Sequence, residues 1–176
     1  MLLRAEDGSE LELKVVGYQS PSASDPRDDW LVIYVRMKVG SESWEGEDPA
    51  LFWEEARNLS KWLDGIATDN PRAGWSIGFL EPVLLFEAYR RTQDSVSLQV
   101  YCEMFPKPTP NEQFSKIFRF KREQLKKGAT DLRSELQQFP SRFPLDELDD
   151  DDDEDDGDND GPSQESRESS DRFGGQ

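Results

Sequence analysis

The sequence predicts an α+β fold: a largely antiparallel β-sheet of about six to seven strands with two packed helices, followed by a disordered acidic C-terminal tail. Segments in which apolar and polar residues alternate follow one another through short turns, which is typical of antiparallel strands. Only two segments carry the apolar stripe of an amphipathic helix. A doubly wound parallel sheet is not expected, because each of its parallel connections would need a crossover helix.

Alternation predicts where the strands lie. The expected strand ranges are 11–18, 30–39, 42–46, 75–79, 82–90, 95–105 and 114–120. Gly40-Ser41 is expected to form a tight turn into the short strand 42–46. Residues 19–29 contain two Pro, three Ser and three Asp and are expected to form a loop. Three prolines, Pro106, Pro108 and Pro110, predict a stiff connector before the last strand.

Two helices are predicted from apolar residues at helical spacing. Asp48-Pro49 is expected to open the first, because Asp is a strong N-cap and Pro is favoured at the first helical position. Its stripe consists of Phe52, Ala56, Leu59, Leu63 and Ile66. The second helix is expected over 121–139, with the stripe Leu125, Ala129, Leu132, Leu136 and Phe139. Gly128 interrupts it at a cost of about 1 kcal/mol relative to Ala.

Acidic residues are concentrated at the end of the chain. The 176 residues carry 38 acidic and 21 basic side chains, a net charge of −17. Residues 147–176 contribute −12 of this charge and residues 1–146 contribute −5. The run "DDDDDEDDGDND" has no apolar periodicity and repels itself, so it cannot offset the entropy of ordering. We therefore expect one domain over 1–146 and a disordered tail over 147–176.

Few groups in the sequence can perform catalysis or bind a metal. The chain has no histidine, which excludes His-dependent triads and His-based zinc sites, and Cys102 alone cannot form a four-cysteine site. Cys102 lies in mid-strand and is expected to be a buried thiol. The acidic run lacks the ligand order of an EF-hand loop. We expect a protein that is not an enzyme, with no catalytic residues, cofactor or metal.

Charge and hydropathy limit where the protein acts. The start of the chain, "MLLRAEDGSELEL", is not a secretory signal, and no apolar run approaches the ~20 residues of a membrane helix. The net negative charge would repel nucleic acid, so the basic cluster at 119–127 is interpreted as a solvated helix face. We expect a cytoplasmic monomer that binds neither nucleic acid directly nor membranes.

Tryptophan and acid occur together in "WEGEDPALFWEEARNLSKWL", residues 44–63. Trp is enriched in interface hot spots, so this stretch is a candidate binding surface. The alternative is core packing, which we expect for Trp62 and weigh equally for Trp53. The candidate contact residues are Trp44, Glu45, Glu47, Trp53 and Glu54, together with Asp25, Asp28, Asp29 and Trp30 of the neighbouring loop.

Several motifs, taken in order, resemble the WapI-like immunity proteins. They are the early "EDGSELELKVVGYQ", then "DDWLVIYVRM", and then Trp44, Asp48, Pro49 and Leu51 in the pattern W-x₃-D-P-x-L. A helix ending in Lys-Trp-Leu and the pattern F-x-E-P-x-L-x-F, which starts at Phe79, complete the resemblance over residues 2–140. The chain departs from the family at Ala50, where a cysteine is usual, and the acidic tail lies outside the pattern.

The resemblance implies a cytoplasmic protein paired with a polymorphic or contact-dependent bacterial toxin. Such a protein would bind the C-terminal domain of its cognate toxin and block it without chemistry of its own. The acidity favours a nuclease-type toxin with a basic surface. An alternative is a binding module in which the acidic tail mimics nucleic acid or accepts basic protein partners.

Overall fold

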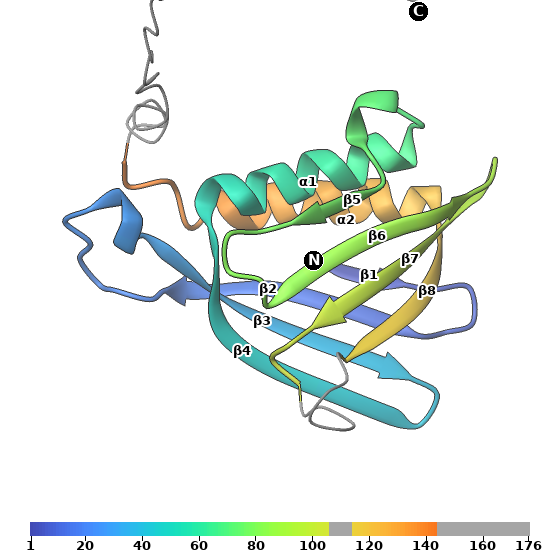
Figure 1. The fold of residues 1–176 in the computed structure, drawn as a ribbon, viewed down its shortest axis with the longest axis horizontal. Helices are drawn as coiled ribbons and strands as arrows, with labels where there is room; N and C mark the ends of the chain where they lie inside the picture. Colours follow the sequence, from blue (N-terminus) through green and yellow to red (C-terminus); the bar gives the residue numbers. More distant parts are fainter. Residues whose placement is uncertain (106–113, 144–176) are drawn as a thin grey trace, which may run out of the picture.

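The computed structural model describes residues 1–105 and 114–143, which form two antiparallel four-stranded sheets and two helices (Figure 1). The first sheet has the order β1-β2-β3-β4, with β1 Leu2–Arg4, β2 Glu10–Tyr18, β3 Trp30–Val39 and β4 Glu42–Phe52. The second has the order β5-β6-β7-β8, with β5 Ser76–Gly78, β6 Leu84–Arg91, β7 Ser95–Cys102 and β8 Ser115–Lys121. The helices are α1 Trp53–Ala67 and α2 Arg122–Leu136, and short 3-10 helices lie at Pro26–Asp28 and Pro71–Ala73.

The α+β class predicted from the sequence is confirmed, whereas the strand count and the single sheet differ from the prediction. All seven predicted strands are present, and β1 is an eighth. β1 escaped prediction because three residues are too few to show alternation. The proline-rich connector and the predicted tail over 147–176 lie outside the described residues.

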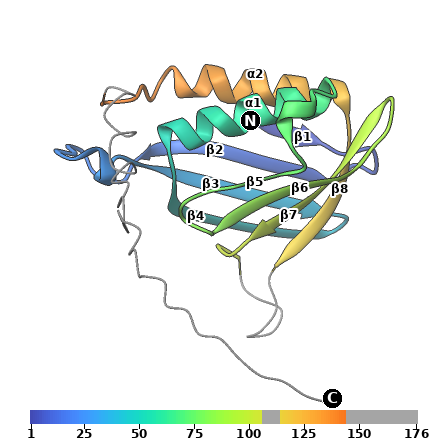
Figure 2. The same ribbon diagram turned by 45° about the horizontal axis from the view of Figure 1, so that its top comes forward.

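The element order repeats: four strands are followed directly by a helix, twice along the chain. The two helices lie side by side in both views and run in opposite directions (Figure 2). α2 packs on α1 and also on β1 and β2 of the first sheet, although it follows the second sheet in sequence. The two repeats therefore interlock rather than standing as separate layers.

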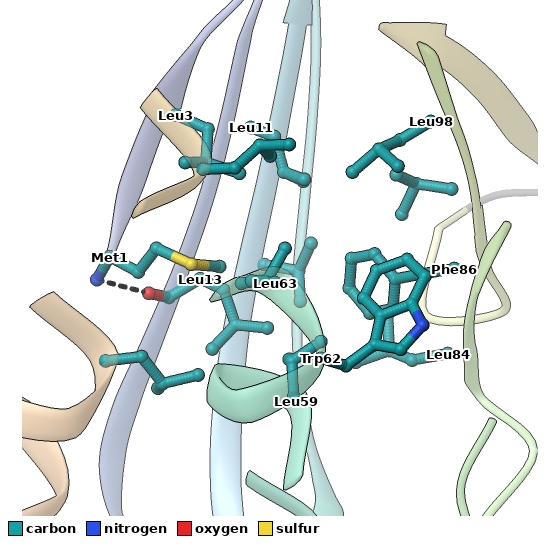
Figure 3. Close-up of a cluster of buried hydrophobic side chains, with 14 of the residues drawn as sticks. Met1, Leu3, Leu11, Leu13, Leu59, Trp62, Leu63, Leu84, Phe86 and Leu98 are labelled. Atoms are coloured by element: carbon teal, nitrogen blue, oxygen red, sulfur yellow. Dashed lines mark hydrogen bonds between the residues drawn. The ribbon is translucent and has the colours of Figure 1, made fainter. Parts of the chain in front are cut away.

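A single hydrophobic core joins the two sheets through α1 (Figure 3). Leu3, Leu11 and Leu13 enter it from the first sheet, and Leu84, Phe86 and Leu98 enter it from the second. Leu59, Trp62 and Leu63 of α1 lie between them. The expectation that Trp62 packs in the core is confirmed, because it is only 5% exposed.

The predicted start of the first helix was wrong. Asp48 and Pro49 belong to β4, where they pair with Ile33 and Val32 of β3, and α1 begins only at Trp53. Pairing with β3 outweighs the local preference for a helix cap, and Pro49 is tolerated because β4 is the edge strand of its sheet. The helix is capped instead by the Glu55 carboxylate, which accepts a hydrogen bond of 2.9 Å from the backbone N–H of Phe52.

Gly128 has a packing reason that the sequence did not reveal. A Cβ at this position of α2 would lie 2.4 Å from Cδ2 of Leu3 and 3.2 Å from Sδ of Met1. Glycine therefore allows α2 to approach β1 closely, and this close contact offsets the cost of glycine in a helix.

Arg122, the first residue of α2, connects the end of α1 to the second sheet. Its guanidinium donates hydrogen bonds to the backbone carbonyls of Ile66 (3.1 Å) and Ala67 (3.0 Å) and pairs with the carboxylate of Asp69 at 2.7 Å. It also donates from Nε to the carbonyl of Thr92 in the β6–β7 turn, at 2.9 Å. α1 has no basic residue in its last turn, so Arg122 supplies the positive charge that favours a helix C-terminus.

Arg122→Ala is expected to lower the free energy of unfolding by about 3 kcal/mol, because it leaves several acceptors without their charged donor. Urea unfolding of the full chain measures the change. Arg133→Ala is the control, because Arg133 is an exposed arginine of the same helix, and its loss should change stability by less than about 0.5 kcal/mol. Equal stability of the two variants would contradict the role given to Arg122.

Candidate functional site

The outward face of the first sheet carries rows of paired charges. The carboxylate of Glu12 lies 2.5 Å from Nζ of Lys14 and 2.9 Å from the guanidinium of Arg36. The hydrogen bond from Lys14 lowers the pKa of Glu12, against an opposing effect of burial. The hydroxyl of Tyr34 donates to Glu45 at 2.8 Å. Glu45 and Glu47, both candidate contact residues, lie exposed at the β4 end of this face.

Trp44 lies on the opposite face of β4 from these two glutamates. It pairs with the buried Met37, and its ring centroid lies 5.0 Å from that of Phe114. Nζ of Lys116 sits 4.5 Å above the indole. The expectation that Trp44, Glu45 and Glu47 form one surface is therefore wrong, because successive residues of a strand point to opposite faces.

Other candidate contact residues lie near the start of α1. Trp30 packs on Phe52 with ring centroids 4.0 Å apart. The residue after Phe52 is Trp53, which is half-buried. The guanidinium of Arg57 lies 5.3 Å from the Trp53 ring and pairs with Glu54 at 2.6 Å. A cavity of about 20 Å³ is lined by Pro26, Asp29, Phe52, Trp53, Glu54, Ser141 and Phe143. It has room for about one water molecule.

The three aspartates of the predicted loop have different environments. Asp29 is 6% exposed and accepts a hydrogen bond of 2.7 Å from Nε of Arg142. The same guanidinium lies 4.0 Å above the Tyr18 ring and donates to the carbonyl of Ser20 at 2.9 Å. Asp28 is exposed, and the carbonyl of Asp25 accepts its N–H at 3.0 Å. Asp29 thus fastens the segment after α2 to the loop and offers little surface to a partner.

The structure also describes the environment of Cys102. It is fully buried in β7, as expected, and burial raises the pKa of the thiol to about 12. Such a thiol stays protonated near neutral pH and is a poor nucleophile. In residues 1–105 and 114–143 no three acidic or sulfur ligands converge on a metal position. No helix in these ranges is long and apolar enough to cross a membrane.

The sequence analysis missed three apolar side chains on the outward face of the second sheet. Leu85, Tyr101 and Ile117 lie there, and Ile117 is 55% exposed. The signal was available: the outward positions of β7 and the first half of β8 are almost free of charge, although 34% of the chain is charged.

Comparison with known protein families identifies the family of this chain. The family model described as the immunity protein WapI-like family matches residues 1–140. The chain belongs to this family, and the match spans both sheets and both helices. No curated protein matches the chain. No solved structure matches it either.

Asp29→Ala is expected to lower the free energy of unfolding by about 2 kcal/mol, because the partly buried Arg142 loses its counter-charge. Asp28→Ala, one position earlier and exposed, should change it by less than about 0.5 kcal/mol. Thermal or urea unfolding distinguishes the two. If both variants are as stable as the wild type, Asp29 does not fasten the loop.

Proposed function

We propose that this protein is an immunity protein that binds a cognate bacterial toxin domain and neutralises it by covering the active site or the entry to it. The observation that carries the proposal is the family match, which spans every strand and helix of the described fold. Immunity of this kind needs a folded surface and no chemistry of its own. The protonated, buried thiol of Cys102 accords with a role in binding rather than catalysis.

The charge of the chain indicates the kind of toxin. A net charge of −17 favours a partner with a positive surface, and toxins that act on nucleic acid carry such surfaces. We infer a nuclease-type toxin. Opposite net charges raise the rate of association, and this effect weakens as salt screens the charges.

Within the candidate set, the exposed acids are best placed to provide this attraction. Glu45 and Glu47 point outward from the edge strand, and Asp28 is exposed in the loop before β3. Asp29 is left out of the proposed contact because it is buried and paired with Arg142, and Trp44 because it lies on the inward face of β4 against Phe114. Trp30, Trp53, Glu54 and Asp25 stay in the proposed set as its half-buried part.

A second candidate function places the inhibition in the acidic tail. The observation that favours it is that the family match ends at residue 140, ahead of a segment with a net charge of −12. In this alternative the tail itself occupies the nucleic-acid site of a basic partner. The folded domain would then act only as its carrier.

Co-expression with the toxin domain encoded beside this gene separates the two functions. The full chain is compared with a full-length variant in which the acids of 149–160 are replaced by Asn and Gln. If cells grow with the wild type and also with the variant, the folded surface neutralises the toxin. Growth with the wild type alone favours the tail, and growth with neither contradicts immunity against this toxin.

Charge reversal tests the exposed acids directly. The double variant Glu45→Lys with Glu47→Lys should slow association with the inactivated toxin domain about 10-fold at low salt, with a smaller difference at high salt. Stopped-flow fluorescence measures the rate. Glu123→Lys with Asp131→Lys, which makes the same charge change on α2, is the control. Equal rates for both double variants would assign the effect to net charge alone.

A further inference from the structure

A groove lies between α1 and the short 3-10 helix that follows it, and we call it the α1 groove. Its volume is about 260 Å³, and its lining residues are Asn58, Lys61, Trp62, Gly65, Asn70, Arg72 and Ala73. The four from α1 share one side of the helix, because the last three follow the first by three, four and seven positions. Gly65 lets the two walls approach closely, since a Cβ there would lie 2.7 Å from Cβ of Ala73. The backbone N–H of Asn70 also donates to the carbonyl of Gly65 at 2.9 Å.

The α1 groove presents positive charge and hydrogen-bond donors. Lys61 and Arg72 are exposed, and neither forms an ion pair within the described ranges. The side-chain carbonyl of Asn70 already accepts the N–H of Arg72 at 3.0 Å, so the NH₂ group of this amide is left for a ligand. Asn58 adds a second exposed amide. None of the seven lining residues is acidic, so the groove is built to receive an anion.

Another cation-lined cavity differs in this respect. Lys121, Arg122 and Lys126 line a cavity of about 370 Å³ at the start of α2, but Asp94 and Glu123 line it as well. Arg122 is already engaged with the carbonyls at the end of α1. A carboxylate entering this cavity would meet two others, whereas one entering the α1 groove would meet only cations and amides.

The described chain ends beside α1, shortly before the acidic run. Phe143 lines a small cavity together with Trp53 and Glu54 of the first turn of α1. The α1 groove begins at Asn58, about 6 Å further along the helix at 1.5 Å per residue. Asp149 follows Phe143 by six residues, a length of chain that spans up to about 20 Å. The start of the acidic run can therefore reach the groove.

We propose that the acidic run of this same chain, residues 149–156, docks in the α1 groove. All eight of these residues are Asp or Glu, and ionised carboxylates only accept hydrogen bonds, which matches the donors of Lys61, Arg72 and the two amides. Exposed ion pairs are individually weak, but a short tether raises the effective concentration of the run to the order of millimolar. A basic partner would then compete with the groove for the tail. The inference does not depend on the proposed function.

Spin labelling of the full chain tests the contact. Gly157→Cys places a nitroxide label directly after the acidic run without changing its charge, and Cys102 stays unlabelled because it is fully buried. The side-chain amide NMR signals of Asn58 and Asn70 report on the groove. We expect both signals to lose most of their intensity at low salt. They should recover most of it in about 1 M salt, where the Debye length is about 3 Å.

Two double variants separate the α1 groove from general attraction. Lys61→Gln with Arg72→Gln should restore the amide signals at low salt, because it removes the charge of the groove. Lys121→Gln with Lys126→Gln removes the same charge from the other cavity and should leave the broadening in place. All four side chains are exposed, so both variants should keep the backbone spectrum of a folded domain.

Each outcome bears on the inference. Amide signals that the label leaves intact in the wild type would overturn it, and so would broadening that survives Lys61→Gln with Arg72→Gln. Equal recovery in both double variants would replace the groove with an attraction to net charge. Mixing labelled chains with unlabelled ¹⁵N chains identifies the source of the tail. Broadening in that mixture would assign the groove to the tail of a second copy instead.

Discussion

The guanidinium of Arg122 is the constraint on which the arrangement of helices and sheets depends. It holds the last carbonyls of α1, the Asp69 carboxylate and the β6–β7 turn at one point. Side chains of α1 lie between those of the two sheets in the core, so Arg122 holds the end of a helix against which both sheets pack. The positive charge offsets the negative end of the helix dipole, which makes a charge that is only 13% exposed favourable at this position.

Sequence patterns predicted the elements of the fold but not their partners. Alternation predicted seven strands because it reports which residues share a face, and that property is local. It carries no information on which strands pair, so the division into two sheets was not predictable. The prediction that Asp48-Pro49 begins a helix was wrong for a related reason. The local preference for a helix cap, about 1 kcal/mol, is smaller than the stabilisation from strand pairing between β3 and β4. Gly128 was explained only by Leu3, a residue on another element.

The candidate site was less predictable than the fold, because residue type does not determine direction. Trp44 and Glu45 are neighbours in sequence and lie on opposite faces of β4. Asp29 resembled an exposed loop acid until Arg142, 113 positions later, was found to cover it. The outward pair of Leu85 and Tyr101 was hidden because its members come from two strands, and only the register places them opposite one another. A surface built in this way needs the tertiary structure before it can be recognised.

The interlocked repeats have a consequence for how the chain acquires its structure. The backbone N–H of Val15 donates to the carboxylate of Glu135, a residue 120 positions away, and α2 covers β1. The first four strands and α1 therefore lack their cover until residues beyond 130 have been synthesised. Contacts between such distant residues slow folding, because a long loop must close before they form. The domain can therefore complete its fold only once nearly all of its residues have been synthesised.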